Sequence, residues 1–301
     1  MKKYIYKIVL FLIGFCIALE LVCVPFHPLK KFGMQYVDVI NKTKKLSYED
    51  DYSIEAIILG DSIPWAGISP LRMYAQDKIT VYNCSTSGQR LIDSTAILKR
   101  ALKLQSPKLV VLDVNCAFTP INSIRYYVER IFPIIRYHDY YGKNLWLESN
   151  ADDWKGYNYT LDCTINVQKK YMIESVVNWP KLNKKYLDKI YSICQKNSIS
   201  LVLMALPCPN SWNQTKHDLI QKWADKKSVE FLDFNSNSMV DIDYSKDFRD
   251  NGEHLNDNGA TKCSYALGKY LKETYNLQGK INQEYERAIE AVGVYGQDGL
   301  Q

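Results

Sequence analysis

Histidine is scarce in this chain, and several familiar site patterns are missing. The 301 residues include only four histidines, and the eight cysteines contain no Cys-x-x-Cys pair. Widely and irregularly spaced cysteines of this kind argue against a zinc site. Lysine and arginine are scattered, with a formal net charge of +5, so the chain lacks the basic patch typical of a nucleic-acid-binding protein. With so few histidines, the search for a general base is short.

The composition is that of an ordinary globular protein. Hydrophobic residues make up 47% of the chain and charged residues 24%, which is enough apolar material for a sizeable core. If the folded part lies outside the cytoplasm, some cysteines can pair, and the sequence leaves that pairing open.

The first 27 residues differ from the rest. Lys2, Lys3 and Lys7 precede an apolar stretch over residues 8–24. A basic start followed by an apolar segment is typical of a signal peptide or an uncleaved signal anchor. No small-x-small cleavage site follows, so we predict a single transmembrane helix with its basic end inside and the domain outside the cytoplasm. A buried N-terminal helix is the alternative.

Apolar runs then alternate with helical patterns, after a polar stretch at residues 28–52 that we expect to be a stalk or an entry to the domain. Strands are predicted at 53–59, 79–83, 108–114, 200–206 and 229–234, and helices at 89–105, 180–197, 211–226 and 258–275. Continuous apolar strands that alternate with helices are typical of a parallel sheet covered on both faces. We therefore predict an α/β domain over residues 53–276 with a central parallel five-stranded sheet. Residues 277–301 are polar, and we expect a less ordered tail.

Residues 120–177 interrupt this alternation and are rich in Tyr, Trp and Arg. We interpret them as an insertion after the third strand. Its aromatic residues, among them Trp154 and Tyr157, either stack on sugars or pack a small satellite core, and packing is favoured for most of them. Arg136 and His138 are the candidates for a substrate-binding position over the reactive site.

Polar residues follow the predicted strands where each strand ends. Gly60-Asp61-Ser62 follows the first strand, Cys84 to Gly88 the second, and Asp113-Val114-Asn115 the third. Residues 250–256, Asp-Asn-Gly-Glu-His-Leu-Asn, follow the fifth strand and precede the last helix. Because reactive groups of open parallel sheets collect at the carboxyl ends of the strands, we expect these segments to share one edge.

Ser62 is the candidate nucleophile at this edge. A serine hydroxyl needs a base within hydrogen-bond reach and a third group that orients the base. Only His254 among the histidines lies in such a segment with acids beside it, so we predict His254 as the base and Asp250 as the orienting acid. The backbone N–H groups of Ser62 and Gly88 and the side-chain amide of Asn115 are the candidate oxyanion donors.

Each of these residues also has a purely structural interpretation. Gly-Asp-Ser favours turns, and Gly88 can simply end a strand or begin a helix. Asn115 and Asp250 suit cap positions beside a helix or turn. The downstream His254 segment, in the right chain order, favours catalysis.

The order of these residues resembles the SGNH (GDSL-like) hydrolase family, whose four blocks are named for Ser, Gly, Asn and His. The blocks look like Gly60-Asp61-Ser62, Gly88, Asn115, and Asp250 to His254, within residues 53–276. The resemblance implies a flavodoxin-like three-layer α/β/α fold, a Ser-His-Asp type of triad and no metal or other cofactor.

The run His254-Leu255-Asn256, followed by Gly259-Ala260, is similar to a membrane-attached branch that includes DltD-like and alginate-acetylation-like proteins. Members of that branch work on acyl groups of envelope polymers. The resemblance therefore implies an acyl-ester hydrolase or O-acyltransferase. Its expected partners are an acylated carbohydrate or envelope polymer and a membrane acyltransferase.

Two departures from the family pattern leave alternatives open. The family usually spaces its acid and histidine as Asp-x-x-His, whereas Asp250 stands four residues before His254 and Glu253 is adjacent to it. Asp250, Glu253 or a backbone carbonyl can therefore orient the ring. The third block usually reads Gly-x-Asn-Asp, and here it reads Asp-Val-Asn-Cys over residues 113–116. A non-catalytic envelope-assembly or glycan-binding factor on the same scaffold is the second hypothesis.

Overall fold

The central feature of the fold is one parallel sheet. The computed structural model describes residues 2–24, 37–120, 124, 127, 128, 131, 132, 154–164, 167, 175–235 and 239–294. The sheet strands are β1 (Ala56–Leu59), β2 (Val81–Asn83), β3 (Leu109–Asp113), β4 (Ser200–Ala205) and β5 (Glu230–Asp233). They lie in the order β2-β1-β3-β4-β5, and every neighbouring pair is parallel. The predicted five-stranded parallel sheet is confirmed.

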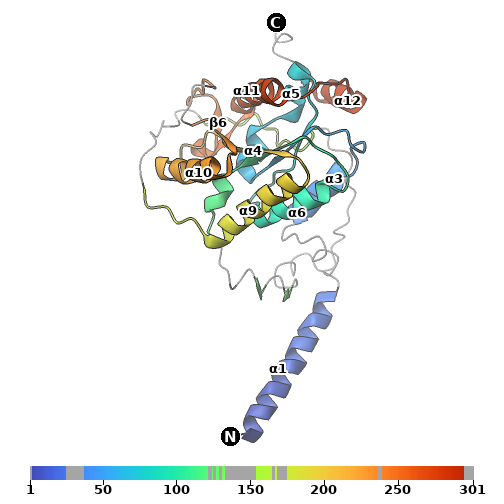
Figure 1. Ribbon diagram of the computed structural model, residues 1–301, viewed down its shortest axis with the longest axis vertical. Helices are drawn as coiled ribbons and strands as arrows, with labels where there is room; N and C mark the ends of the chain where they lie inside the picture. Colours follow the sequence, from blue (N-terminus) through green and yellow to red (C-terminus); the bar gives the residue numbers. More distant parts are fainter. Residues whose placement is uncertain are drawn as a thin grey trace.

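Helices cover both faces of this sheet (Figure 1). One face is covered by α6 (Leu91–Ala101), α9 (Lys181–Lys196) and α10 (Gln214–Lys227), and the other by α5 (Pro70–Asp77) and α11 (Asp257–Tyr275). Alternate strand side chains point to opposite faces, so Ile57 and Leu59 enter one core while Ile58 enters the other. The three-layer α/β/α fold is therefore as predicted.

Shorter elements complete the domain. They are α3 (Val37–Leu46), α4 (Ser62–Gly67), η2 (Asn115–Phe118), η4 (Asp250–Gly252) and α12 (Gln283–Val292), with a small antiparallel pair of β6 (Phe248–Arg249) and β7 (His254–Leu255). Four of these shorter elements contain the candidate site residues: Ser62 lies in α4, Asn115 in η2, Asp250 in η4 and His254 in β7.

Of the two expectations for residues 28–52, the stalk is wrong from residue 37 on, where the chain already belongs to the domain; residues 28–36 lie outside the described residues. Leu46 of α3 is fully buried in the same core as α6. The carboxylate of Glu49 is also buried and pairs with the Lys155 ammonium, Nζ to Oε1 2.8 Å. This segment is polar in sequence because its few apolar residues occupy one side of a short helix, which hides them from a search for apolar runs.

The expected polar, less ordered tail is also wrong for residues 283–292, which form α12. Tyr285 is fully buried, and its hydroxyl donates to the Val81 carbonyl at 2.6 Å. Ala288 and Ile289 are buried with it. These residues recur at helical spacing, so one face of an otherwise polar helix packs against the domain.

The N-terminal helix α1 (Lys2–Cys23) matches the expected anchor in length and character. Tyr4–Cys23 is 20 residues long, and within the described residues it is the one helix long and apolar enough to cross a membrane. None of its most apolar stretch is buried. A bilayer core needs about 20 apolar residues of helix, so the length is sufficient for one span.

All eight cysteines are free thiols. Across the described ranges, no group of three or more His, Cys, Asp or Glu side chains could hold a metal ion.

Candidate active site

The candidate site lies at the point of the sheet where the order in which strands are added reverses. From β1 the chain first adds β2 on one side and then β3 on the other. In open α/β sheets, ligands bind in the crevice outside the carboxyl ends of the strands at such a switch point. Ser62 follows β1 and Asn115 follows β3, so both lie at the edge where this crevice is expected.

The structure brings the predicted serine, histidine and aspartate together. The Ser62 Oγ lies 2.8 Å from His254 Nε2, and His254 Nδ1 lies 3.1 Å from an oxygen of Asp250. If Nδ1–H donates to the carboxylate, Nε2 is free to accept the hydroxyl proton of Ser62. The His254 side chain is 18% exposed and that of Asp250 is 56% exposed, so the acid end of this chain of contacts faces water.

A small hairpin explains how Asp250 reaches the ring despite its unusual spacing. In the β6–β7 pair, Arg249 lies opposite His254. Asp250, Asn251 and Gly252 between them have φ of 51°, 56° and 92°, and this left-handed turn accommodates the additional residue. Two of the three lack the freedom of glycine, which makes the turn a strained one. The carboxylate of Asp250 is thereby directed back at the imidazole.

Glu253, the other acid beside the histidine, has a different contact. Its backbone carbonyl accepts a hydrogen bond from Cys208 Sγ at 3.3 Å. Within the described part of the chain, Asp250 is the acid that contacts the ring. The geometry therefore favours Asp250 over Glu253.

Ser62 is the first residue of α4, and its neighbours fix where it stands. The Asp61 side chain caps the helix by accepting from the Ile63 N–H at 3.0 Å. A Cβ at Gly60 would lie 2.4 Å from Pro64 Cγ and 3.0 Å from Asp113 Cβ. Glycine at position 60 avoids these contacts, and Asp61 caps the helix, so these two residues of the triplet have structural roles beside Ser62.

Asn83, which the sequence analysis missed, ties this helix to the end of β2. It is fully buried, and its Nδ2 donates to the carbonyls of Pro64 at 2.8 Å and Ile68 at 2.9 Å. Its Oδ1 accepts from the Ser85 N–H at 3.1 Å. The available signal was a polar residue at the end of an apolar strand, directly before the second predicted block.

The predicted oxyanion donors are located at the same edge. Gly88, with φ of 64°, lies in the loop between β2 and α6 and is exposed. Asn115 begins η2 and is 8% exposed, and its Nδ2 donates to Ser211 Oγ at 2.6 Å. The N–H of Asn115 donates to Asp113 Oδ1 at 3.0 Å, which fixes the backbone there.

Two carboxyl groups lie beside Ser62 at the ends of β1 and β3: Asp113, which is fully buried, and Asp61, which is half-buried. Burial raises the pKa of Asp113 well above its usual value, and the charge of Asp61 raises it further, against hydrogen bonds from the Leu206 and Asn115 N–H groups. Burial also raises the pKa of Asp61, opposed by the Ile63 N–H and then by the charges of His254 and Lys216. The two carboxyl groups therefore resist simultaneous ionisation.

A second His–Asp pair occurs on α10. His217 on this helix is only 22% exposed, and its Nδ1 lies 2.7 Å from Asp233 Oδ2. Its ring packs on Phe231, with centroids 5.5 Å apart. The same carboxylate accepts from Trp212 Nε1 at 2.8 Å, so this pair joins α10 to the end of β5.

The described segment 154–164 of the predicted insertion contacts α4 through its backbone and contains three aromatic residues. The Asn158 N–H donates to the Trp65 carbonyl at 2.9 Å. The rings of Trp154 and Tyr159 are stacked at 4.5 Å, and Tyr159 is 39% exposed. Tyr157 is buried and donates to Asp257 at 3.1 Å, which is packing as expected. Arg136 and His138 lie outside the described residues.

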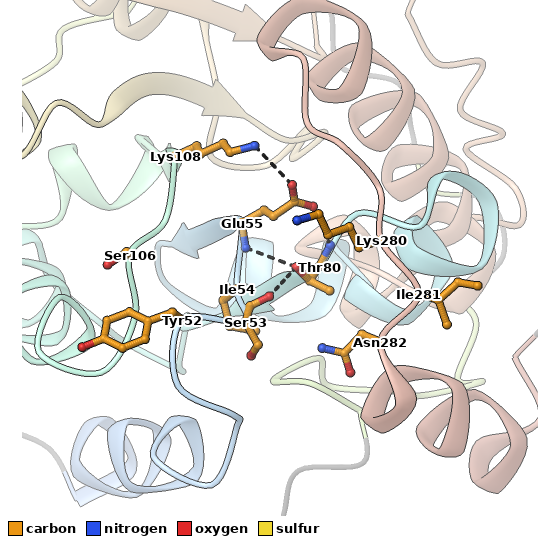
Figure 2. Close-up of a pocket in the computed structure, with 10 residues that line it drawn as sticks. All are labelled: Tyr52, Ser53, Ile54, Glu55, Thr80, Ser106, Lys108, Lys280, Ile281 and Asn282. Atoms are coloured by element: carbon orange, nitrogen blue, oxygen red, sulfur yellow. Dashed lines mark hydrogen bonds and ion pairs between the residues drawn. The ribbon is translucent and has the colours of Figure 1, made fainter.

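A separate cavity of about 310 Å³ lies at the opposite edge of the sheet (Figure 2). It is lined by residues that precede β1, β2 and β3, including Glu55, Thr80 and Lys108. The Lys108 ammonium lies 3.6 Å from Glu55. Because it lies at the amino ends of the strands, this cavity does not belong to the Ser62 site.

Comparison with known proteins gives matches among solved structures. No protein-family model matches the sequence, and no curated protein matches it. The esterase EstA from Pseudoalteromonas sp. is 12% identical, with a TM-score of 0.44 over 74% of this chain and 99% of that one. The lipase/acylhydrolase from Enterococcus faecalis is 12% identical, with a TM-score of 0.42 over 76% and 100%. A GDSL-like lipase from Bacteroides thetaiotaomicron is 12% identical, with a TM-score of 0.40 over 72% and 87%. Similarity at this level concerns the fold alone. The activity of this chain has to be inferred from its own residues.

Proposed function

We propose that the chain is a serine-dependent acyl-ester hydrolase or O-acyltransferase that acts on a glycan or polymer of the cell envelope. The observation that supports it is the chain of contacts from Ser62 Oγ to His254 Nε2 at 2.8 Å and from His254 Nδ1 to Asp250 at 3.1 Å. The nucleophile contacts its base, and the base contacts the acid that orients it, which is the arrangement that nucleophilic catalysis by serine requires.

In this proposal Ser62 Oγ attacks the acyl carbonyl carbon while His254 Nε2 takes the hydroxyl proton. The carbonyl oxygen becomes an oxyanion, which the N–H groups of Ser62 and Gly88 and the amide of Asn115 stabilise. The tetrahedral intermediate collapses to an acyl-serine, and His254 gives its proton to the departing alkoxide. Asp250 holds the ring and offsets its positive charge.

A second nucleophile then releases the acyl group from Ser62. If water attacks, with His254 again as base, the result is hydrolysis. If a sugar hydroxyl attacks, the result is acyl transfer, and a membrane acyltransferase that handles the same acyl group is the natural partner. The exclusion of water from the site decides between the two outcomes.

Two further features support an envelope substrate. Helix α1 is long enough for one membrane span, and the basic residues before its apolar stretch favour a cytoplasmic N-terminus with the domain outside. The stacked Trp154 and Tyr159 rings lie in the segment that contacts α4, and flat aromatic surfaces of this kind can pack against sugar rings. Similarity of the sequence to the DltD-like branch leads to the same class of substrate.

A fluorophosphonate probe on the full chain in detergent tests the proposal. We expect one adduct, located on Ser62 by peptide mass spectrometry, absent in Ser62→Ala and slowed about 10³-fold or more in His254→Ala. Ser192→Ala, at an exposed position on α9, and His217→Ala, which removes the second His–Asp pair, are the matched controls. Both should label at the wild-type rate.

Failure of the folded wild type to react with fluorophosphonates and with p-nitrophenyl esters would overturn the proposal. That result would favour the second hypothesis, an envelope-assembly or glycan-binding factor without catalytic activity. Labelling that depends on His217 in place of His254 would mean that the base is wrongly assigned.

A further inference from the structure

A chain of polar contacts runs behind the site from α10 to the histidine segment. Lys216 Nζ donates to the Ser211 carbonyl and lies 3.4 Å from Asn115 Oδ1. The Asn115 Nδ2 donates to Ser211 Oγ at 2.6 Å, and that hydroxyl lies 2.9 Å from Cys208 Sγ. Cys208 Sγ donates to the carbonyl of Glu253, the residue before His254.

We propose that Lys216 is a positioning residue for the oxyanion side of this site, where it fixes the orientation of the Asn115 amide and offsets the charge of the carboxyl groups beside Ser62. The proposal rests on the proposed function and adds a residue that no block of the family resemblance contains.

The first part of the argument concerns the Asn115 amide. A lysine ammonium has donors and no acceptor, so the oxygen of the Asn115 amide must face Lys216 and the nitrogen must face away. One of the two amide hydrogens is then used by Ser211 Oγ, and the second remains for a developing oxyanion. Without the ammonium, the amide can rotate by half a turn and present its oxygen, which would repel the oxyanion.

The second part concerns charge. Lys216 interacts with both Asp61 and Asp113, the carboxyl groups beside Ser62. Negative charge there opposes the formation of an oxyanion in a site of low dielectric. Burial lowers the pKa of Lys216, and the charges of Asp61 and Asp113 counteract that change. The carboxyl groups at the ends of β1 and β3 thus attract the ammonium, and its charge favours the transition state.

The test compares Lys216→Met with Lys222→Met, an exposed lysine on the same helix. We measure kcat and KM with p-nitrophenyl acetate and the rate of labelling by a fluorophosphonate, with the melting temperature of each variant. Loss of an oxyanion donor itself costs about 10²–10³-fold in kcat. For Lys216→Met we expect a fall in kcat of at least about tenfold with KM nearly unchanged, and wild-type values for Lys222→Met.

A second variant separates positioning from a merely structural role. In Lys216→Ala, ethylammonium should restore part of kcat, whereas tetramethylammonium, which has no hydrogen-bond donor, should not. Wild-type kcat in Lys216→Met would overturn the proposal, as would a loss in Lys216→Ala that ethylammonium leaves unchanged. If the wild type itself reacts with neither reagent, the proposed function fails first, and the two failures are thereby distinguished.

Discussion

Removal of the Asp250 carboxylate tests the weakest contact of the proposed triad. The attraction between two unit charges is about 332/(ε·r) kcal/mol. At the observed 3.1 Å this gives about 1.3 kcal/mol in water, with ε near 80, and about 5.4 kcal/mol at an effective ε near 20. The Asp250 side chain is 56% exposed, so solvent screening moves the value toward the lower bound.

We therefore expect Asp250→Ala to raise the activation barrier by about 2 kcal/mol, which is roughly a 30-fold loss of rate. A buried triad aspartate, by comparison, contributes on the order of 10⁴-fold. The assay is the rate of fluorophosphonate labelling at Ser62, together with kcat for p-nitrophenyl acetate. The melting temperature should stay close to that of the wild type, because removal of an exposed side chain leaves no cavity.

Glu253→Gln is the matched control, because Glu253 is the acid adjacent to His254 in sequence. It should label at the wild-type rate. A larger loss in Glu253→Gln than in Asp250→Ala would refute the geometric reasoning, since the acids would then be assigned the wrong way round. A 10⁴-fold loss in Asp250→Ala would refute the estimate of solvent screening, because it would require a closed and dry site.

Three other outcomes are expected from the buried polar groups. Glu49→Gln leaves the ammonium of Lys155 buried without its partner, so the free energy of unfolding in urea should fall by about 3–5 kcal/mol. Burial, and then the charge of Asp61, raise the pKa of Asp113, so its favourable contribution is present below about pH 4 and is lost as the pH rises through the folded pKa. The stability of the wild type relative to Asp113→Asn should therefore fall as the pH rises above about 4, in paired urea titrations. Maleimide should label the exposed Cys163 in the native chain but not Cys194, whose pKa burial raises to about 12, and peptide mass spectrometry checks this.

The sheet could be predicted because its signal is local. The three central strands β1, β3 and β4 are nearly continuous apolar runs that are buried, as in β3, where all five residues are buried. Parallel strands need long connections, so alternation with helices fixed their direction as well. The same reasoning placed the blocks of Ser62 and His254 at one edge of the sheet before any geometry was known.

The errors lie where burial depends on distant partners. Helix α12 is polar by count, and its Tyr285 is buried through contacts with residues distant in sequence, among them Val81 and Tyr74. Glu49 is buried because Lys155 lies within 2.8 Å, more than a hundred positions away. No window of sequence contains both members of such a pair, so a polar segment is assigned to the surface by default.

Lys216 was missed for a related reason. It is one of several lysines on α10, and nothing in its immediate sequence separates it from the exposed Lys222. Only the packing of α10 beside the end of β3 places its ammonium near Asn115. A residue that acts through another side chain is therefore harder to recognise from the sequence than a residue that takes part in the reaction itself.

The four-residue spacing between Asp250 and His254 shows how far a motif can vary while its geometry is kept. In a strand, one additional residue would turn the carboxylate to the opposite face from the ring. Here the additional residue lies in a turn whose three residues 250–252 all have positive φ, and the antiparallel pairing of Arg249 with His254 fixes the two ends. The turn therefore absorbs the difference in length, and Asp250 still contacts Nδ1. It follows that a change of one residue between an acid and a base is decisive where an extended strand connects them, and a hairpin turn at the edge of a sheet does not impose this requirement.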